Sequence, residues 1–103
     1  MQKKLAIALT TKPEDPSTKT TLQVAKAALD KKIDVYLYVT DDGAYNLKNE
    51  SVFDLAKQGA KLFVCAYGCQ NRNIPIDDLR ATYCGLVVLS NLIEGTDRFF
   101  TLN

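Results

Sequence analysis

Residues 61–72 read KLFVCAYGCQNR, and this stretch indicates both the fold class and the place where chemistry is expected. Residues 62–64 are apolar at consecutive positions, which is typical of a parallel strand in a sheet covered by helices on both faces. Gly68 and the polar residues after it end the apolar run. Because open parallel sheets bind ligands beyond the carboxyl ends of their strands, we expect Cys65 and Cys69 at the functional rim of the sheet.

Strand-like segments recur along the whole chain. Four further segments are rich in apolar, β-branched or aromatic residues and are predicted to be strands: residues 5–9 (LAIAL), 34–40, 86–89 (LVVL) and 98–102 (RFFTL). Helical patterns alternate with them, which predicts an α/β fold with three layers, α/β/α, around a mostly parallel five-stranded sheet. The length of 103 residues suits a single domain over residues 1–103.

Capping signals place the first two helices between these strands. Ser17 or Thr18 is expected to cap an amphipathic helix after the first strand. Ser51, with Asp54 three residues later, resembles a capping box, and Gly59 is expected to end the helix that follows.

The remaining connections are shorter. The Asp-Asp-Gly sequence at residues 41–43 predicts a turn after the second strand. The acidic pair at residues 77–78 is expected to begin a short helix that closes near Gly85. Ser90 is expected to cap a last helical turn before the final strand.

Composition excludes several classes of partner and compartment. Lysine and arginine number 13 against 12 acidic residues, and the charges are interspersed, so neither nucleic acid nor a membrane is an expected partner. The apolar run near the N-terminus is too short for a signal peptide, and no segment approaches a membrane span. Three cysteines, an odd number, predict reduced thiols in a cytoplasmic protein rather than a disulfide framework.

The chain contains no histidine. This removes Cys/His and Ser/His/Asp arrangements and histidine-ligated metal sites. Any nucleophile must therefore be activated by backbone dipoles, by arginine or lysine, or by the substrate. We predict neither a metal nor a cofactor.

Two longer stretches, residues 59–74 (GAKLFVCAYGCQNRNI) and 86–102 (LVVLSNLIEGTDRFFTL), resemble the DsrE/DsrF-like family, which includes the TusD-like sulfur-relay proteins. The most specific match is a strand-end cysteine followed seven residues later by an arginine, which Cys65 and Arg72 reproduce. The family usually has glycine after this arginine. Asn73 stands there instead, and asparagine tolerates left-handed backbone better than most residues.

The resemblance implies a five-stranded sheet between helices and a homo-oligomer, a trimer or a hexamer. It also implies that sulfane sulfur is carried as a persulfide on the strand-end cysteine, which is Cys65 in this chain. The partners would be sulfur donor and acceptor proteins or small sulfane-sulfur compounds.

The candidate site residues follow from these two lines of reasoning. Cys65 is the candidate carrier, and the N–H groups of a helix that begins after Tyr67, together with the charge of Arg72, would stabilise its anion. Cys69 either resolves an oxidised or persulfidated Cys65 or packs. Asp42 lies on the same predicted rim and either contacts substrate or forms a solvated turn. Arg72, Tyr67 and Asp42 are the candidate substrate-binding residues.

Three functions are compatible with the sequence. The first is a persulfide carrier, a possible sulfurtransferase. The second is a non-catalytic homo-oligomeric ligand-binding or scaffold module, which predicts a buried Cys65 that alkylates slowly. The third is a thiol redox switch between Cys65 and Cys69, and in each case Cys84 is expected to pack. Oligomerisation is predicted from the small size of the chain and from four aromatic side chains: Phe53, Tyr83, Phe99 and Phe100.

Overall fold

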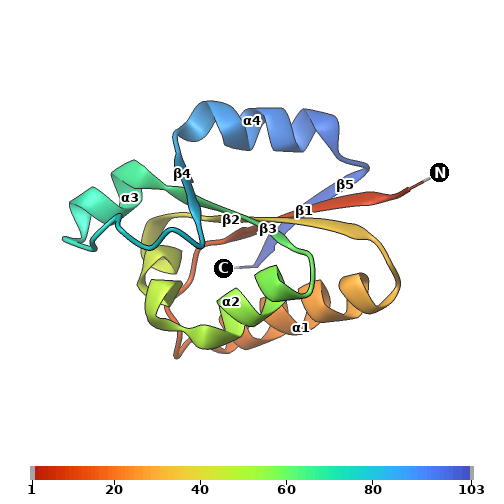
Figure 1. Cartoon of the computed structure of the whole chain (residues 1–103), viewed down its shortest axis with the longest axis horizontal. Coiled ribbons are helices and arrows are strands. Elements are labelled where there is room, and N and C mark those ends of the chain that lie inside the picture. Colours follow the sequence, from red (N-terminus) through yellow and green to blue (C-terminus); the bar gives the residue numbers. More distant parts are fainter. Residues whose placement is uncertain (1, 103) are drawn as a thin grey trace.

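The computed structural model describes residues 2–102. Five strands form one parallel sheet in the order β4-β3-β2-β1-β5: β1 (Lys4–Leu9), β2 (Asp34–Val39), β3 (Lys61–Cys65), β4 (Thr82–Cys84) and β5 (Arg98–Leu102). The connections contain four α-helices and one 3₁₀ helix: α1 (Pro16–Asp30), η1 (Asp41–Lys48), α2 (Glu50–Lys57), α3 (Ala66–Asn71) and α4 (Leu86–Gly95). Figure 1 shows α1 and α2 on one face of the sheet and α4 on the other, which confirms the predicted layers.

The sheet face covered by α1 and α2 carries the main core. Its register partners come from three neighbouring strands and form two buried rows: Ile7, Leu37 and Leu62, then Leu9, Val39 and Val64. Full burial of one such side chain contributes roughly 1.5–3 kcal/mol of transfer free energy. The central strands therefore show the nearly continuous apolar character expected of a parallel sheet.

The opposite sheet face is covered by α4 alone and is less well packed. Tyr38 and Cys65 point to this face, because Val39 and Val64 beside them point into the main core and side chains alternate along a strand. No residue of α4 is buried, and Val87 is 75% exposed. This layer is therefore the one with the most apolar surface left open to solvent.

Both predicted helix caps were wrong by two residues. Asp15 caps α1, since its carboxylate accepts the N–H of Ser17 at 2.8 Å, with proline at the first helical position. Thr18 is instead buried, and its hydroxyl bonds carbonyl oxygens of the preceding loop. Asn49 caps α2 by accepting the N–H of Ser51 at 3.1 Å, so Ser51 lies inside the helix.

The segments before and after α2 each contain a residue with a positive φ angle. The predicted turn at residues 41–43 is the start of η1, and Asp41 has a left-handed φ of 52°. Gly59 follows the end of α2 with a φ of 117°, as its predicted role as a helix stop requires. Asn73 also has a left-handed φ, 54°, which fits the expectation for the residue after Arg72.

The segment between α3 and β4 contains no helix, contrary to the prediction at residues 77–78. Asp78 instead accepts the backbone N–H of Arg80 at 3.0 Å in an Asx turn. Beyond it, residues 82–84 extend along β3 and form the fourth strand. The local side-chain bond at Asp78 thus competes successfully with helix formation.

The predicted strand at residues 86–89 was also wrong, because these residues form the first turn of α4, and Ser90 lies within this helix rather than at its cap. The chain must cross from one edge of the sheet to the other between β4 and β5, and parallel strands need a long crossover for this. The partly buried apolar residues of α4 recur at helical spacing: Val88, Leu89 and Leu92.

Candidate functional site at the carboxyl end of the third strand

Cys65 ends β3 and is at the same time the N-cap of α3. Its Sγ accepts the backbone N–H of Gly68 at 3.4 Å. This amide is one of the donors that the first turn of a helix leaves without an intrahelical partner. The site therefore supplies a hydrogen-bond donor to the sulfur, and the side chain is buried, with 3% exposure.

Arg72 and Asp42 lie together on the rim where both were predicted. The Arg72 guanidinium donates to the Asp42 carboxylate from Nε and Nη2, each at 3.0 Å. Its Nη1 also donates to the carbonyl oxygen of Gly68 at 3.2 Å. Arg72 thus ties α3 to the beginning of η1 and holds Gly68, whose N–H faces Cys65.

Tyr67 follows Cys65 by two residues but points outward. Its side chain is 68% exposed, and α3 begins at Ala66 rather than after Tyr67 as predicted. Its role in substrate binding stays a prediction. A surface hollow of about 150 Å³ lies beside Arg72 and is also lined by Lys48 and Asn73.

Cys69 lies within α3 and is completely buried in the main core. Burial raises the pKa of its thiol, the nearby Cys65 raises it further, and Arg72 acts in the opposite direction. Its role as a resolving thiol stays a prediction. No disulfide joins any of the three cysteines.

Sequence reasoning missed the side chains closest to Cys65 on the α4 face of the sheet. Cys84 is the register partner of Cys65 in the β3–β4 pair. The Tyr38 hydroxyl donates to the carbonyl oxygen of Gly85 at 3.1 Å and lies within hydrogen-bond reach of both thiols. Burial and the two neighbouring thiols raise the pKa of Tyr38 above its ordinary range.

The Cys84 thiol interacts with both Cys65 and Tyr38. Burial raises the pKa of the Cys84 thiol, and Cys65 raises it further, whereas hydrogen bonds from Tyr38 and with the Val64 backbone oppose the increase. A residue-type pattern in the sequence could not have shown this cluster. It depends on the register between β3 and β4, and the fourth strand was predicted four residues too late.

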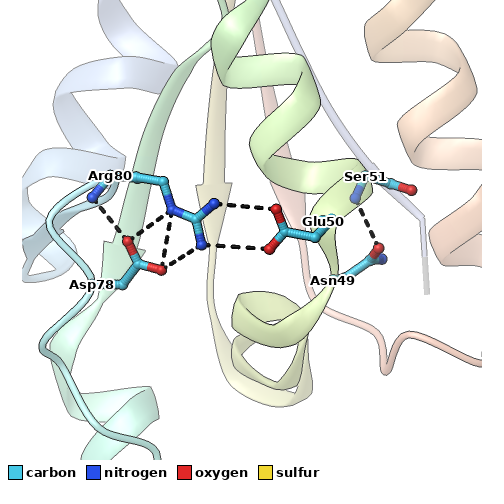
Figure 2. A network of polar contacts seen from close by, with 5 residues as sticks. All are labelled: Asn49, Glu50, Ser51, Asp78 and Arg80. Carbon is cyan, nitrogen blue, oxygen red and sulfur yellow. Dashed lines mark hydrogen bonds and ion pairs between the residues drawn. The ribbon is translucent and has the colours of Figure 1, made fainter.

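A cluster of charged side chains holds the segment that leads into β4 (Figure 2). Arg80 contacts both carboxylate oxygens of Glu50 at 3.2 and 3.4 Å and pairs with Asp78 at 2.8 Å. The guanidinium also lies over the ring of Phe53, 3.7 Å from its centroid. The start of α2 is thereby connected to the approach to Cys84.

Residues 2–102 contain no group of three potential ligating side chains placed to hold a metal ion. Over the same residues, no helix combines the length and apolar character needed to cross a membrane.

Two solved structures have the same fold. The YchN protein from E. coli is 21% identical to this chain, with a TM-score of 0.81, and the match covers 99% of this chain and 100% of YchN. A conserved protein of unknown function from Bacteroides thetaiotaomicron, BT1422, is 15% identical with a TM-score of 0.81, and the match covers 96% of this chain and 94% of that one. Curated protein sequences include no match. The sequence pattern of the DsrE/DsrF-like family matches residues 3–102, and the chain therefore belongs to this family.

Proposed function

We propose that this protein is a cytoplasmic sulfur-trafficking protein that carries sulfane sulfur as a persulfide on Cys65. Membership of the DsrE/DsrF-like family supports a role of the sulfur-relay type. The observation that carries the proposal is the hydrogen bond from the Gly68 N–H to Cys65 Sγ, at the carboxyl end of a parallel strand. The free state of all three thiols fits a reducing compartment.

The chemistry is a thiol exchange. The Cys65 thiolate attacks the outer sulfur of a donor persulfide or polysulfide, a new S–S bond forms on Cys65, and the donor leaves as a thiolate. No net oxidation occurs, because the sulfane sulfur only changes its carrier. Amide donors favour the anionic sulfur before and after transfer, since hydrogen bonds to charged groups are stronger than those to neutral ones.

A donor must reach a sulfur atom that is only 3% exposed. On the open side, β4, a three-residue edge strand, pairs with β3 beside Cys65, and α4, which has no buried residue, lies on the same face of the sheet (Figure 1). Segments with few buried apolar contacts open locally at low free-energy cost. We therefore assign the route to Cys65 to the β4–α4 side of the sheet.

Intact mass spectrometry after incubation with inorganic polysulfide tests the carrier role. The wild-type chain should gain one sulfur atom, Cys65→Ser should gain none, and Cys69→Ser should load like the wild type. Absence of both added sulfur and a newly formed disulfide on the wild type, or equal loading of Cys65→Ser, would rule the role out.

The burial of Cys65 favours a second candidate, a non-catalytic ligand-binding or scaffold module with the same fold. In that case Cys65 should react with iodoacetamide as slowly as the core residue Cys69, and polysulfide should leave the mass unchanged. If the protein is a carrier, Cys65 should react at least about tenfold faster than Cys69, because a thiol in the core reacts only after the surrounding structure has opened locally.

We also propose that the protein is a homo-oligomer, through a surface other than the one first expected. Phe53 is buried, and the other three aromatic residues behind the prediction are partly buried: Tyr83, Phe99 and Phe100. The large apolar side chains left exposed are mostly aliphatic, and three of them lie on α4: Leu86, Val87 and Ile93. Exposed apolar side chains gathered on one helix are typical of protein interfaces.

A further inference from the structure

We infer that Cys84 is the resolving thiol of Cys65, and that it discharges the Cys65 persulfide as hydrogen sulfide while a Cys65–Cys84 disulfide forms. The inference rests on the proposed function and names a second reacting residue for the same site. It also gives a chemical role to a cysteine that the sequence suggested was only packing.

The strand register places the two cysteines side by side. Cys65 and Cys84 are Cα partners in the parallel β3–β4 pair, so both side chains point to the same face of the sheet. Neighbouring strands lie about 4.8 Å apart. This spacing falls within the Cα separation of about 4.4–6.8 Å that disulfides span.

Two further features favour reaction between this pair. β4 is a three-residue edge strand and can shift toward β3 more easily than an internal strand. The Tyr38 hydroxyl interacts with both thiols, and its proton, which is donated to the Gly85 carbonyl oxygen in this structure, can turn toward an anionic sulfur. The buried cluster therefore contains two thiols and a shared hydrogen-bond donor.

Cys69 is less well placed for the same task, although it is closer in sequence. Its side chain is packed in the core between the sheet and α1–α2, whereas Cys65 lies on the α4 side. Its carbonyl oxygen also accepts the N–H of Ile74 at 2.9 Å and holds the end of α3 in place. A Cys65–Cys69 bond would need α3 to leave its position.

The proposed step balances without an outside oxidant. The Cys84 thiolate attacks Cys65 Sγ, a bond forms between the two Sγ atoms, and the bond from Cys65 to the outer sulfur breaks. The outer sulfur leaves as hydrosulfide and takes up the proton lost by Cys84. The outer sulfur is reduced and the Cys84 sulfur is oxidised, while Cys65 Sγ exchanges one S–S bond for another. A thiol reductant returns the disulfide to the starting state.

Tryptic mapping distinguishes the two possible cysteine pairs. Cleavage after lysine and arginine puts Cys65 and Cys69 together in the peptide 62–72, and Cys84 alone in the peptide 81–98. A Cys65–Cys84 disulfide therefore joins two peptides, whereas a Cys65–Cys69 disulfide stays within one.

The first experiment treats the wild-type protein with diamide, a thiol oxidant, and uses no sulfur donor. We expect the cross-linked pair 62–72/81–98 in the wild type and in Cys69→Ser, and its loss in Cys65→Ser and Cys84→Ser. A disulfide confined to peptide 62–72, or no disulfide in the wild type, would overturn the inference. Because no persulfide is involved, either result leaves the carrier role of Cys65 to be judged separately.

The second experiment follows polysulfide-loaded protein after the donor has been removed. The wild type should release hydrogen sulfide and lose two hydrogen atoms of mass relative to the reduced protein, and Cys84→Ala should keep its added sulfur at least about tenfold longer, because it lacks the neighbouring nucleophile. Cys69→Ala is the matched control and should behave like the wild type. Equal release from Cys84→Ala and wild type would contradict the role of Cys84, and circular dichroism verifies that each variant is folded.

Discussion

At the scale of single residues, the proposed persulfide chemistry depends on the backbone N–H group that donates a hydrogen bond to the sulfur atom of Cys65. The Gly68 N–H donates to Sγ, and Arg72 holds Gly68 through its carbonyl oxygen. The arginine thus acts on the sulfur through Gly68 and not by direct contact, since its guanidinium is paired with Asp42. We interpret Arg72 as a positioning residue.

Replacing Gly68 tests the amide donor directly. Gly68→Pro removes the N–H at the third residue of α3, which needs no intrahelical partner, and should shorten the lifetime of the Cys65 persulfide by about tenfold or more. Gly68→Ala keeps the N–H, and its added Cβ would meet only ordinary contacts of 3.4 Å or longer. The measurement is persulfide decay by mass spectrometry, and equal decay in the two variants would contradict the role of the amide.

The buried thiol of Cys69 and the partly buried thiol of Cys84 should make stability depend on pH. The folded state raises the pKa of Cys69 and of Cys84, so at high pH these thiols ionise more readily in the unfolded chain. Their contribution to stability is fully present below the unfolded pKa of about 8.5 and is lost as pH rises through the folded pKa. Urea unfolding under reducing conditions should thus give a lower free energy at pH 10 than at pH 7.

Cys69→Ala should reduce this dependence on pH, because one of the thiols is then missing from both states. A free energy of unfolding that increases between pH 7 and pH 10, or a pH dependence unchanged by Cys69→Ala, would contradict the assignment. The two titrations are measured with the same reductant and salt.

At the scale of elements, the approach of η1 to the end of β1 fixes the rim of the sheet. A Cβ added to Gly43 would lie 1.9 Å from the carbonyl oxygen of Leu9, so no larger residue fits without backbone movement. Asp42, the partner of Arg72, precedes this glycine directly. The close contact at Gly43 therefore sets the position of the carboxylate that anchors α3.

Gly43→Ala should accordingly destabilise the fold by about 3 kcal/mol, as strongly overpacked sites do. Gly95→Ala is the matched control, because a Cβ there meets nothing within 4 Å. The control should change the free energy of unfolding by less than about 1 kcal/mol, in the direction of the higher helix propensity of alanine. Similar unfolding midpoints for the two variants would contradict the close approach.

The sequence alone predicted those strands whose residue pattern fits only one type of secondary structure. Residues 5–9 and 98–102 are strands as expected, β2 ends one residue before the predicted Thr40, and β3 ends at Cys65. The run at residues 86–89 was misassigned, because consecutive apolar residues suit a buried strand and a half-covered helix equally well. Only the need for a crossover between the two edges of the sheet decides between them.

The candidate site was likewise predicted only in part from the sequence. The strand ends brought Cys65, Arg72 and Asp42 to one rim, as the rule for parallel sheets predicts. The position of Cys84 and Tyr38 near Cys65 was missed, because it depends on how neighbouring strands pair, and the sequence alone does not give that pairing. The 3% exposure of Cys65 depends likewise on how neighbouring strands and helices pack, and not on the local sequence.

At the scale of the whole molecule, the two layers of helices are unequal. α1 and α2 cover one face of the sheet with a tight core, while α4 crosses the other face without burying any of its residues (Figure 1). The thiol cluster lies under this less protected layer. A second copy packed on α4 would shield apolar side chains and control access to Cys65 at the same time.

A charge introduced on α4 should therefore dissociate the oligomer. Val87→Glu replaces a side chain that is 75% exposed in the single chain, so it should leave the fold intact while lowering the mass measured by light scattering. Gln23→Glu adds the same charge to the exposed side of α1 and should leave the mass unchanged. A wild-type protein that is monomeric at micromolar concentration would contradict the proposed interface.

The most direct test of the central claim is to locate the sulfur atom on the polysulfide-treated wild-type protein. Trapped persulfides are digested with trypsin, and fragment ions of the peptide 62–72 show which of its two cysteines carries the added sulfur. We predict one added sulfur, on Cys65. Sulfur found on Cys69, or none in this peptide of either the wild type or Cys84→Ala, would contradict the account.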